Sequence, residues 1–106
     1  MRLDITFRNM KPSDRVRDRA EKKFQKVAKH LREPIEADLV LKMERHRHSA
    51  ELRVSGAGDS FTAHEASEDL YNTIDSIMTK VERTVRRAKE RSIDRQQAAG
   101  PQFDPS

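Results

Sequence analysis

The first 31 residues, MRLDITFRNMKPSDRVRDRAEKKFQKVAKHL, decide the fold class because their hydrophobic period changes partway along. Apolar and polar residues alternate from Leu3 to Phe7, which is the pattern of a half-buried strand. From Ser13 onward, where we expect an N-cap, apolar residues recur every three or four positions on one helical stripe. The members of this stripe are Val16, Ala20, Phe24, Val27 and Leu31. The stretch therefore predicts a strand and then an amphipathic helix, which ends at Glu33 because a residue before proline avoids helical geometry.

The middle of the chain predicts three more strands. Alternating segments at 39–43 and 50–54 are expected to form a hairpin through the polar connection Arg45–His48. After a glycine-containing turn, Phe61 and Ala63 indicate a short fourth strand.

The remainder of the chain predicts a long helix and a tail. We expect Ser67 to cap this helix, and its period fails after Arg91. Its inner stripe comprises Leu70, Ile74, Ile77, Val81, Val85 and Ala88. We therefore predict one domain over residues 1–92 and a flexible C-terminal tail over residues 93–106.

The predicted element order is β-α-β-β-β-α, and every element has one apolar face. We expect an α+β fold, a two-layer sandwich in which a four-stranded mixed sheet carries both helices on one face. The first two strands should be parallel if they are neighbours, because a helix connects them.

Composition limits the classes of protein to which this chain can belong. Its 106 residues suffice for one domain, and with 34% hydrophobic and 38% charged residues the core must be thin. The chain has no cysteine, which excludes disulfides and thiolate metal sites and agrees with a reducing compartment. We find no apolar run long enough for a signal peptide or a membrane span, so we expect a cytoplasmic protein without membrane contact.

Basic side chains follow one edge of each predicted helix. The first line consists of Lys22, Lys26 and Lys29, with Arg15 one turn earlier, and the second of Lys80, Arg83, Arg87 and Arg91. Spacings of three, four and seven place such residues on one face of a helix. The acids Asp75 and Glu82 are expected on a different side of the second helix. We therefore expect two neighbouring basic ridges that form one surface suited to nucleic-acid phosphates.

These features also have simpler interpretations. A charged helix edge is often only a solvated face, although residues 80–91 hold six Lys or Arg against two Asp or Glu. His46 and His48 are two candidate metal ligands, but a zinc site takes three or four, so we expect no metal and no other cofactor. Nucleophile and phosphate-loop motifs are absent, and a thin core offers Asp69 and Asp75 no pocket for acid–base chemistry. We therefore expect no enzyme.

The segment Asp69–Asp75, DLYNTID, is the most specific motif of the chain. It is similar to the D-[ML]-Y-x-x-I-D signature of the ribosome hibernation-promoting factors and ribosome-associated translation inhibitors. Four other segments, at 1–6, 23–26, 37–44 and 80–83, resemble that family's first strand, K-[FL]-x-K motif, second strand and K-[LV]-x-R motif, in the same order. The resemblance covers residues 1 to about 91 and is closest to the short members, which have no second, dimer-forming domain.

The resemblance implies a fold similar to double-stranded RNA-binding domains and a role in silencing ribosomes in stationary phase or under stress. It implies binding to the small ribosomal subunit, where occupancy of the aminoacyl and peptidyl sites in the channel for messenger and transfer RNA inhibits translation. By motif position, the expected contacts with ribosomal RNA are Lys23, Lys26, Lys80, Arg83, Arg87 and Lys89. Helical geometry adds Lys22 and Lys29, and Arg86 and Arg91 complete the predicted set. We expect no small-molecule substrate, and a monomer off the ribosome.

Two other functions fit parts of the same sequence. A general double-stranded RNA-binding module acting away from ribosomes would use the same basic ridges. A protein-interaction regulator would not depend on them, so charge reversal at Lys26 and Arg83 would leave its function intact.

Overall fold

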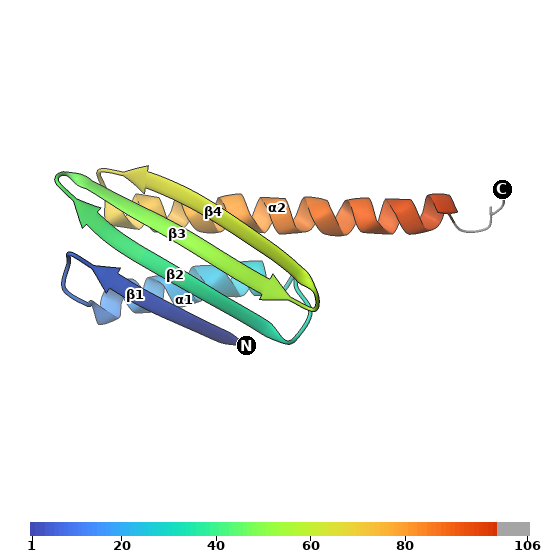
Figure 1. Ribbon diagram of the computed structural model, residues 1–106, viewed down its shortest axis with the longest axis horizontal. Helices are drawn as coiled ribbons and strands as arrows, with labels where there is room; N and C mark the ends of the chain where they lie inside the picture. The colour runs from blue at the N-terminus through green and yellow to red at the C-terminus, as the bar shows by residue number, and fades with distance from the viewer. Residues whose placement is uncertain (100–106) are drawn as a thin grey trace.

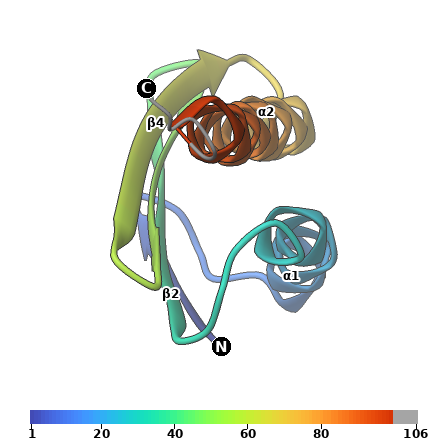
Figure 2. The same ribbon diagram turned by 90° about the vertical axis from the view of Figure 1, so that its right-hand side faces the viewer.

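A computed structural model describes the backbone of residues 1–99 and the side chains of residues 1–90. Its elements are β1 (Arg2–Arg8), α1 (Asp14–Ala28), β2 (Ile35–Glu44), β3 (Arg47–Gly56), β4 (Asp59–Ser67) and α2 (Leu70–Ala99). The strands form one sheet in the order β1-β2-β3-β4, with β1 parallel to β2 and the other neighbours antiparallel. Both helices cover the same face of this sheet (Figure 1, Figure 2). The predicted α+β sandwich is confirmed in its element order and its mixed sheet.

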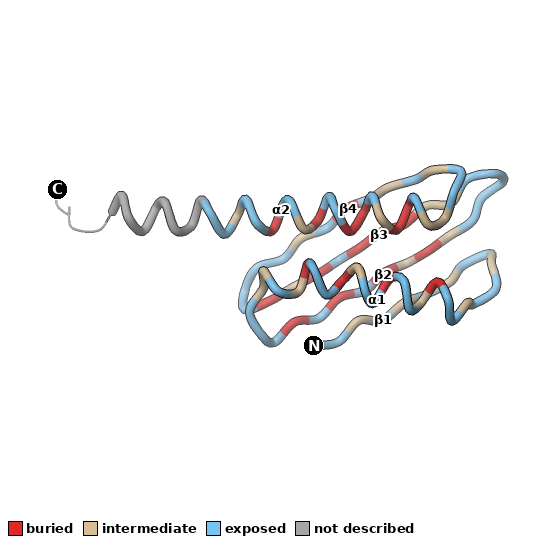
Figure 3. The backbone as a smooth tube through the Cα atoms, turned by 180° about the vertical axis from the view of Figure 1, so that it is seen from behind, coloured by how far each residue is buried: buried red, intermediate tan, exposed pale blue. Residues whose placement is uncertain are grey.

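The hydrophobic core lies between the sheet and the two helices (Figure 3). Both predicted helical stripes are buried where they face the sheet. They contribute Val16, Ala20, Phe24 and Val27 from α1, and Ile74, Ile77, Val81 and Val85 from α2. Because each helix buries one stripe against the sheet, the opposite side of each helix is left to solvent.

The first helix ends earlier than its sequence predicts. Helical structure stops at Ala28, and the N–H groups of His30 and Leu31 donate to carbonyls three positions earlier. These hydrogen bonds, which span three residues, satisfy two of the last carbonyl groups of the helix. The helix can therefore end before Pro34. Leu31 still packs against the core, but the expected helix end at Glu33 is wrong.

Asp69, and not Ser67, caps the second helix. Asp69 Oδ1 accepts hydrogen bonds from the N–H of Tyr71 at 2.8 Å and of Asn72 at 3.2 Å, as an N-cap side chain does. Ser67 is the last residue of β4 and pairs with His48 across the sheet. The prediction of Ser67 as the cap is therefore wrong, because β4 continues to that residue and the helix begins after it.

We expect Asp69→Ala to lower the free energy of unfolding by about 1 kcal/mol, because two N–H groups at the start of α2 lose their acceptor. Glu68→Ala is the control, since this neighbouring acid is exposed and forms no side-chain hydrogen bond or ion pair with the described residues. Urea unfolding followed by circular dichroism measures both variants. Equal destabilisation by the two would contradict the assignment of the cap.

The β2–β3 hairpin is tighter than predicted. Glu44 and Arg47 pair at the ends of the two strands, so the connection consists of Arg45 and His46 alone. Arg45 has a φ of 55°, in the left-handed region that two-residue hairpin turns use. The hairpin therefore presents one guanidinium group and one imidazole at a narrow tip.

Both C-terminal elements extend beyond their predicted ranges. β4 has nine residues and pairs with β3 along its whole length. α2 continues to Ala99, past the end expected after Arg91, and runs beyond the edge of the sheet (Figure 1). Residues 100–106 lie outside the described residues, so the domain over 1–92 and the flexible tail over 93–106 stay predictions. Within the described residues, no helix combines the length and apolar character needed to cross a membrane.

Candidate nucleic-acid interface

The first basic line follows the solvent side of α1. Lys22, Lys26 and Lys29 are exposed, and so is Arg15 one turn earlier. Their exposure follows from helical geometry, because the buried stripe of α1 turns this edge away from the sheet. Among the described side chains, none forms an ion pair with these four cations. They are therefore available to an external anion.

The second basic line lies on α2, on the side that borders β4. Lys80, Arg83 and Arg87 are exposed and line one depression. The other residues that line it are Glu65, Asp75, Ser76, Thr79 and Thr84. Guanidinium groups can bind a phosphate through two parallel hydrogen bonds, and hydroxyls donate to phosphate oxygens. The depression thus has the chemistry of a site for a nucleic-acid backbone.

Arg86 and Lys89 are exposed as well, but they do not line this depression. At about 100° per residue, Lys89 lies roughly 160° around the helix from Arg87. It follows Glu82 by two helical turns and shares the side of α2 that faces α1. Arg91 lies on α2 beyond the residues whose side chains are described. The depression beside β4 therefore gathers three of the six predicted cations of this helix.

Ion pairs between the helices separate the two basic lines. Arg19 of α1 donates two hydrogen bonds to Asp75 of α2, from Nε to Oδ1 at 3.2 Å and from Nη2 to Oδ2 at 2.7 Å. These bonds and the charge of Asp75 raise the pKa of the Arg19 guanidinium above its ordinary value. Lys23 Nζ lies 3.9 Å from Asp75 Oδ1. We call Arg19, Lys23 and Asp75 the helix seam, because together they tie α1 to α2.

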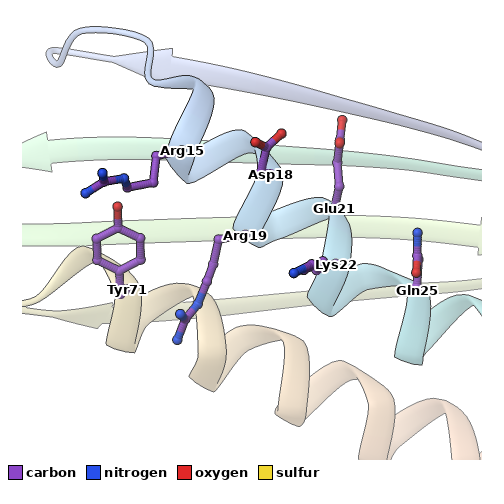
Figure 4. Close-up of a pocket in the computed structure, with 7 residues that line it drawn as sticks. All are labelled: Arg15, Asp18, Arg19, Glu21, Lys22, Gln25 and Tyr71. Carbon is purple, nitrogen blue, oxygen red and sulfur yellow. The ribbon is translucent and has the colours of Figure 1, made fainter.

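Tyr71 extends the helix seam toward the start of α2. The Arg19 guanidinium carbon lies 5.4 Å from the centre of the Tyr71 ring, which is a cation–π distance. Figure 4 shows Arg19 reaching from α1 toward α2 and Tyr71 reaching from α2 toward Arg15. The depression drawn there is also lined by Asp18, Glu21, Lys22 and Gln25. The DLYNTID motif therefore caps α2 through Asp69 and contacts α1 through Tyr71 and Asp75.

The helix seam corrects one expectation about the basic surface. The sequence predicts two neighbouring basic ridges that form one surface, but Asp75 and Glu82 lie between the lines, with Glu82 Oε2 3.4 Å from His30 Nε2. As predicted, both acids lie on a different side of α2 from the contact of Lys80 with β4, although Asp75 also lines the depression that contains Arg83. Asp75 lies there because Arg19 and Lys23 of α1 face α2 and form ion pairs with it.

Arg19 is the residue that sequence reasoning missed. Its partner Asp75 is 56 positions further along the chain, so no local pattern shows the contact. A weaker signal was present, since Arg15, Arg19 and Lys23 recur every four residues along one edge of the helix.

The histidines considered as metal ligands and the aspartates considered for acid–base chemistry show no such site in the described part of the chain. His46 is exposed in the hairpin turn, whereas His48 is half-buried in β3. Within the described part of the chain, no three His, Cys, Asp or Glu side chains are grouped so as to hold a metal ion. Asp69 caps a helix and Asp75 pairs with Arg19, so both carboxylates are engaged in the fold.

The fold defines the class of protein to which this chain is similar. The N-terminal domain of Protein Y from Thermus thermophilus aligns with a TM-score of 0.75 and 27% sequence identity. The alignment covers 82% of this chain and 98% of that domain. The class is thus a small α+β domain with both helices on one face of a four-stranded sheet.

Sequence comparison then identifies the family. Residues 3–93 match the family described as Sigma 54 modulation protein / S30EA ribosomal protein, and the chain belongs to this family. The ribosome hibernation promoting factor of Azotobacter vinelandii is 26% identical over 105 residues, covering 99% of this chain and 98% of that protein. The ribosome hibernation promoting factor of Salmonella typhimurium is 26% identical over 91 residues, covering 86% of this chain and 96% of that protein. The predicted resemblance is confirmed.

Proposed function

We propose that this protein is a ribosome hibernation factor that binds the small ribosomal subunit in the channel for messenger and transfer RNA. Its helices dock on ribosomal RNA and occupy the aminoacyl and peptidyl sites, which inhibits translation under stress or in stationary phase. The mechanism is occupancy, so the protein acts without catalysis, cofactor or small-molecule substrate. It works in the cytoplasm and is a monomer off the ribosome.

Family membership supports the ribosomal part of this proposal. The relatives that align with most of this chain carry the name ribosome hibernation promoting factor. The binding surface is supported by the exposure of cations on both helices. The two helices form one layer on a single face of the sheet (Figure 2). A layer of this kind can approach the RNA backbone without obstruction from the sheet.

The proposed RNA-binding residues differ in their surroundings. The full set is Lys22, Lys23, Lys26, Lys29, Lys80, Arg83, Arg86, Arg87, Lys89 and Arg91. Lys23 and Lys80 each lie near an acid, Asp75 and Glu65 respectively, so they are partly neutralised in the free protein. Arg19 is bound to Asp75 and serves to hold the two helices in register.

The structure favours recognition of backbone and shape over recognition of bases. Within the described residues, Phe7, Phe24 and Phe61 pack against the core, and Tyr71 packs against Arg19. Reading of single-stranded bases usually relies on exposed aromatic rings, whereas phosphate contacts rely on exposed cations. A shaped RNA surface that presents phosphates to both helices is therefore the best ligand for this layer.

Affinity for intact small ribosomal subunits, compared with a plain RNA duplex at the same salt, tests the proposal. We expect the subunit to bind more tightly by more than about tenfold, because a shaped site aligns several contacts at once. Equal affinities would instead identify a general double-stranded RNA-binding module. Charge reversal at Lys26 and Arg83 without loss of either interaction would point to a protein-interaction regulator.

A further inference from the structure

Lys80 is held by two acceptors at the edge of the proposed RNA-binding surface. Its Nζ lies 3.2 Å from Glu65 Oε2 and donates a hydrogen bond to the carbonyl oxygen of His64 at 3.3 Å. Glu65 and His64 are successive residues of β4, so the strand anchors this lysine of α2. In the free protein, the ammonium group is thus bound to a carboxylate at a place where RNA phosphates are proposed to lie.

The surroundings of this ion pair make Glu65 a competitor for phosphate. Arg83 and Arg87 line the same depression and form no ion pair with the described side chains. A phosphate that enters the depression meets two available guanidinium groups, one ammonium that is already neutralised, and one carboxylate that repels it. Asp75 also lines the depression, but its oxygens are taken up by Arg19.

We propose that Glu65 sets the RNA affinity of this surface by competing with phosphate for Lys80. Lys80 is then an exchange contact, which binds Glu65 in the free protein and an RNA phosphate in the complex. This inference rests on the proposed function, because it assigns a role within the same RNA-binding surface. The side chains of Glu65 and Lys80 are 30% and 54% exposed, so the pair is weak enough for phosphate to displace it.

This exchange lowers the affinity of the surface for every RNA ligand. A phosphate gains the Lys80 contact only if it comes close enough to displace the carboxylate, so a distant polyanion gains little from this cation. Specific binding surfaces often include a repulsive group of this kind. The group lowers the binding free energy of every ligand, and only the ligand that fits best makes enough contacts to offset the loss.

Glu65→Gln tests the inference, since it removes the negative charge and keeps the shape of the side chain. We expect affinity for small subunits and for a plain RNA duplex to rise by about two- to fivefold at about 0.1 M salt. The plot of log affinity against log salt should keep its slope, because Lys80 neutralises a phosphate in both complexes and only the competing carboxylate is removed.

Glu51→Gln is the matched control. Glu51 is 34% exposed and lies 3.5 Å from His64 Nε2, but it belongs to the sheet face that carries no helix. It should change RNA affinity by less than about twofold, since it lies away from the basic lines. A rise equal to that of Glu65→Gln would show that the effect is only one of net charge, and would overturn the inference.

A double-mutant cycle with Lys80→Gln identifies the partner of Glu65. We expect Glu65→Gln to lose most of its effect in the Lys80→Gln background, because no ammonium remains to be released. An undiminished effect there would show that Glu65 acts by repulsion alone and not through Lys80.

Measuring both the small subunit and the plain duplex distinguishes a wrong inference about Glu65 from a wrong proposed function. If the subunit binds no better than the duplex, the proposed function fails, while the duplex measurements still test Glu65. If the subunit binds tightly and Glu65→Gln matches the wild-type protein, the inference alone is overturned. Thermal unfolding of each variant shows that the comparison is made between folded proteins.

Discussion

The affinity of this protein for small ribosomal subunits is expected to fall by on the order of a thousandfold or more between about 50 mM and 200 mM salt. Each phosphate neutralised by a cation releases counterions from the RNA, so many phosphate contacts give a steep dependence on salt. The two basic lines and the exposed cations beside them can engage about six to ten phosphates. Filter binding or fluorescence anisotropy over a salt series measures the slope.

A shallow salt dependence would contradict the proposed mode of binding. Exposed apolar side chains offer little alternative, because Met1 and Met43 are the large hydrophobic residues exposed in the described part of the chain. A series in which chloride is replaced by glutamate separates anion competition at the protein from counterion release at the RNA. In both series, affinity for small subunits should fall as the salt concentration rises.

Arg83→Glu is expected to weaken subunit binding by on the order of tenfold or more at about 0.1 M salt. Arg83 lies in the depression between two other cations, so a glutamate there repels the phosphate that the arginine would bind. The slope of affinity against salt should also become shallower by about 0.9 or more. Stability should change little, because Arg83 is exposed and pairs with no described side chain.

Arg53→Glu is the control for this variant because it changes the net charge by the same amount. Arg53 is exposed on β3 and alternates with the buried Leu52 and Val54, so it belongs to the helix-free face of the sheet. Comparable loss of binding in both variants would show that net charge, and not the helical layer, governs the interaction. Unfolding of Arg83→Glu would contradict the position of Arg83 in the structure.

Hydrophobic period predicts most of this fold, because each element has a single apolar face. Leu39 and Leu41 on β2 and Leu52 and Val54 on β3 alternate with polar residues, and all four are buried. The same reasoning predicts the position of the basic lines, because a cation on the side of a helix away from its buried apolar stripe must face solvent. The element order and the exposed edges of the helices were therefore predictable from sequence.

Contacts between distant segments account for what the sequence did not show. The cap of α2 depends on where β4 stops pairing with β3, and the helix seam depends on Arg19 meeting Asp75 across 56 positions. The pairing of Lys80 with Glu65 depends in the same way on how α2 lies against β4. Local pattern gives the direction of a side chain, but its partner is set by the packing of whole elements.

Competition between this protein and transfer RNA tests occupancy of the small subunit most directly. Small subunits programmed with messenger RNA are mixed with the protein at low salt, given increasing transfer RNA, and sedimented, and both ligands are quantified in the pellet. We expect the protein to sediment with the subunits and to be released as transfer RNA fills the peptidyl and aminoacyl sites. Saturating amounts of protein and transfer RNA on the same subunits would contradict the proposal that the helical layer occupies those sites.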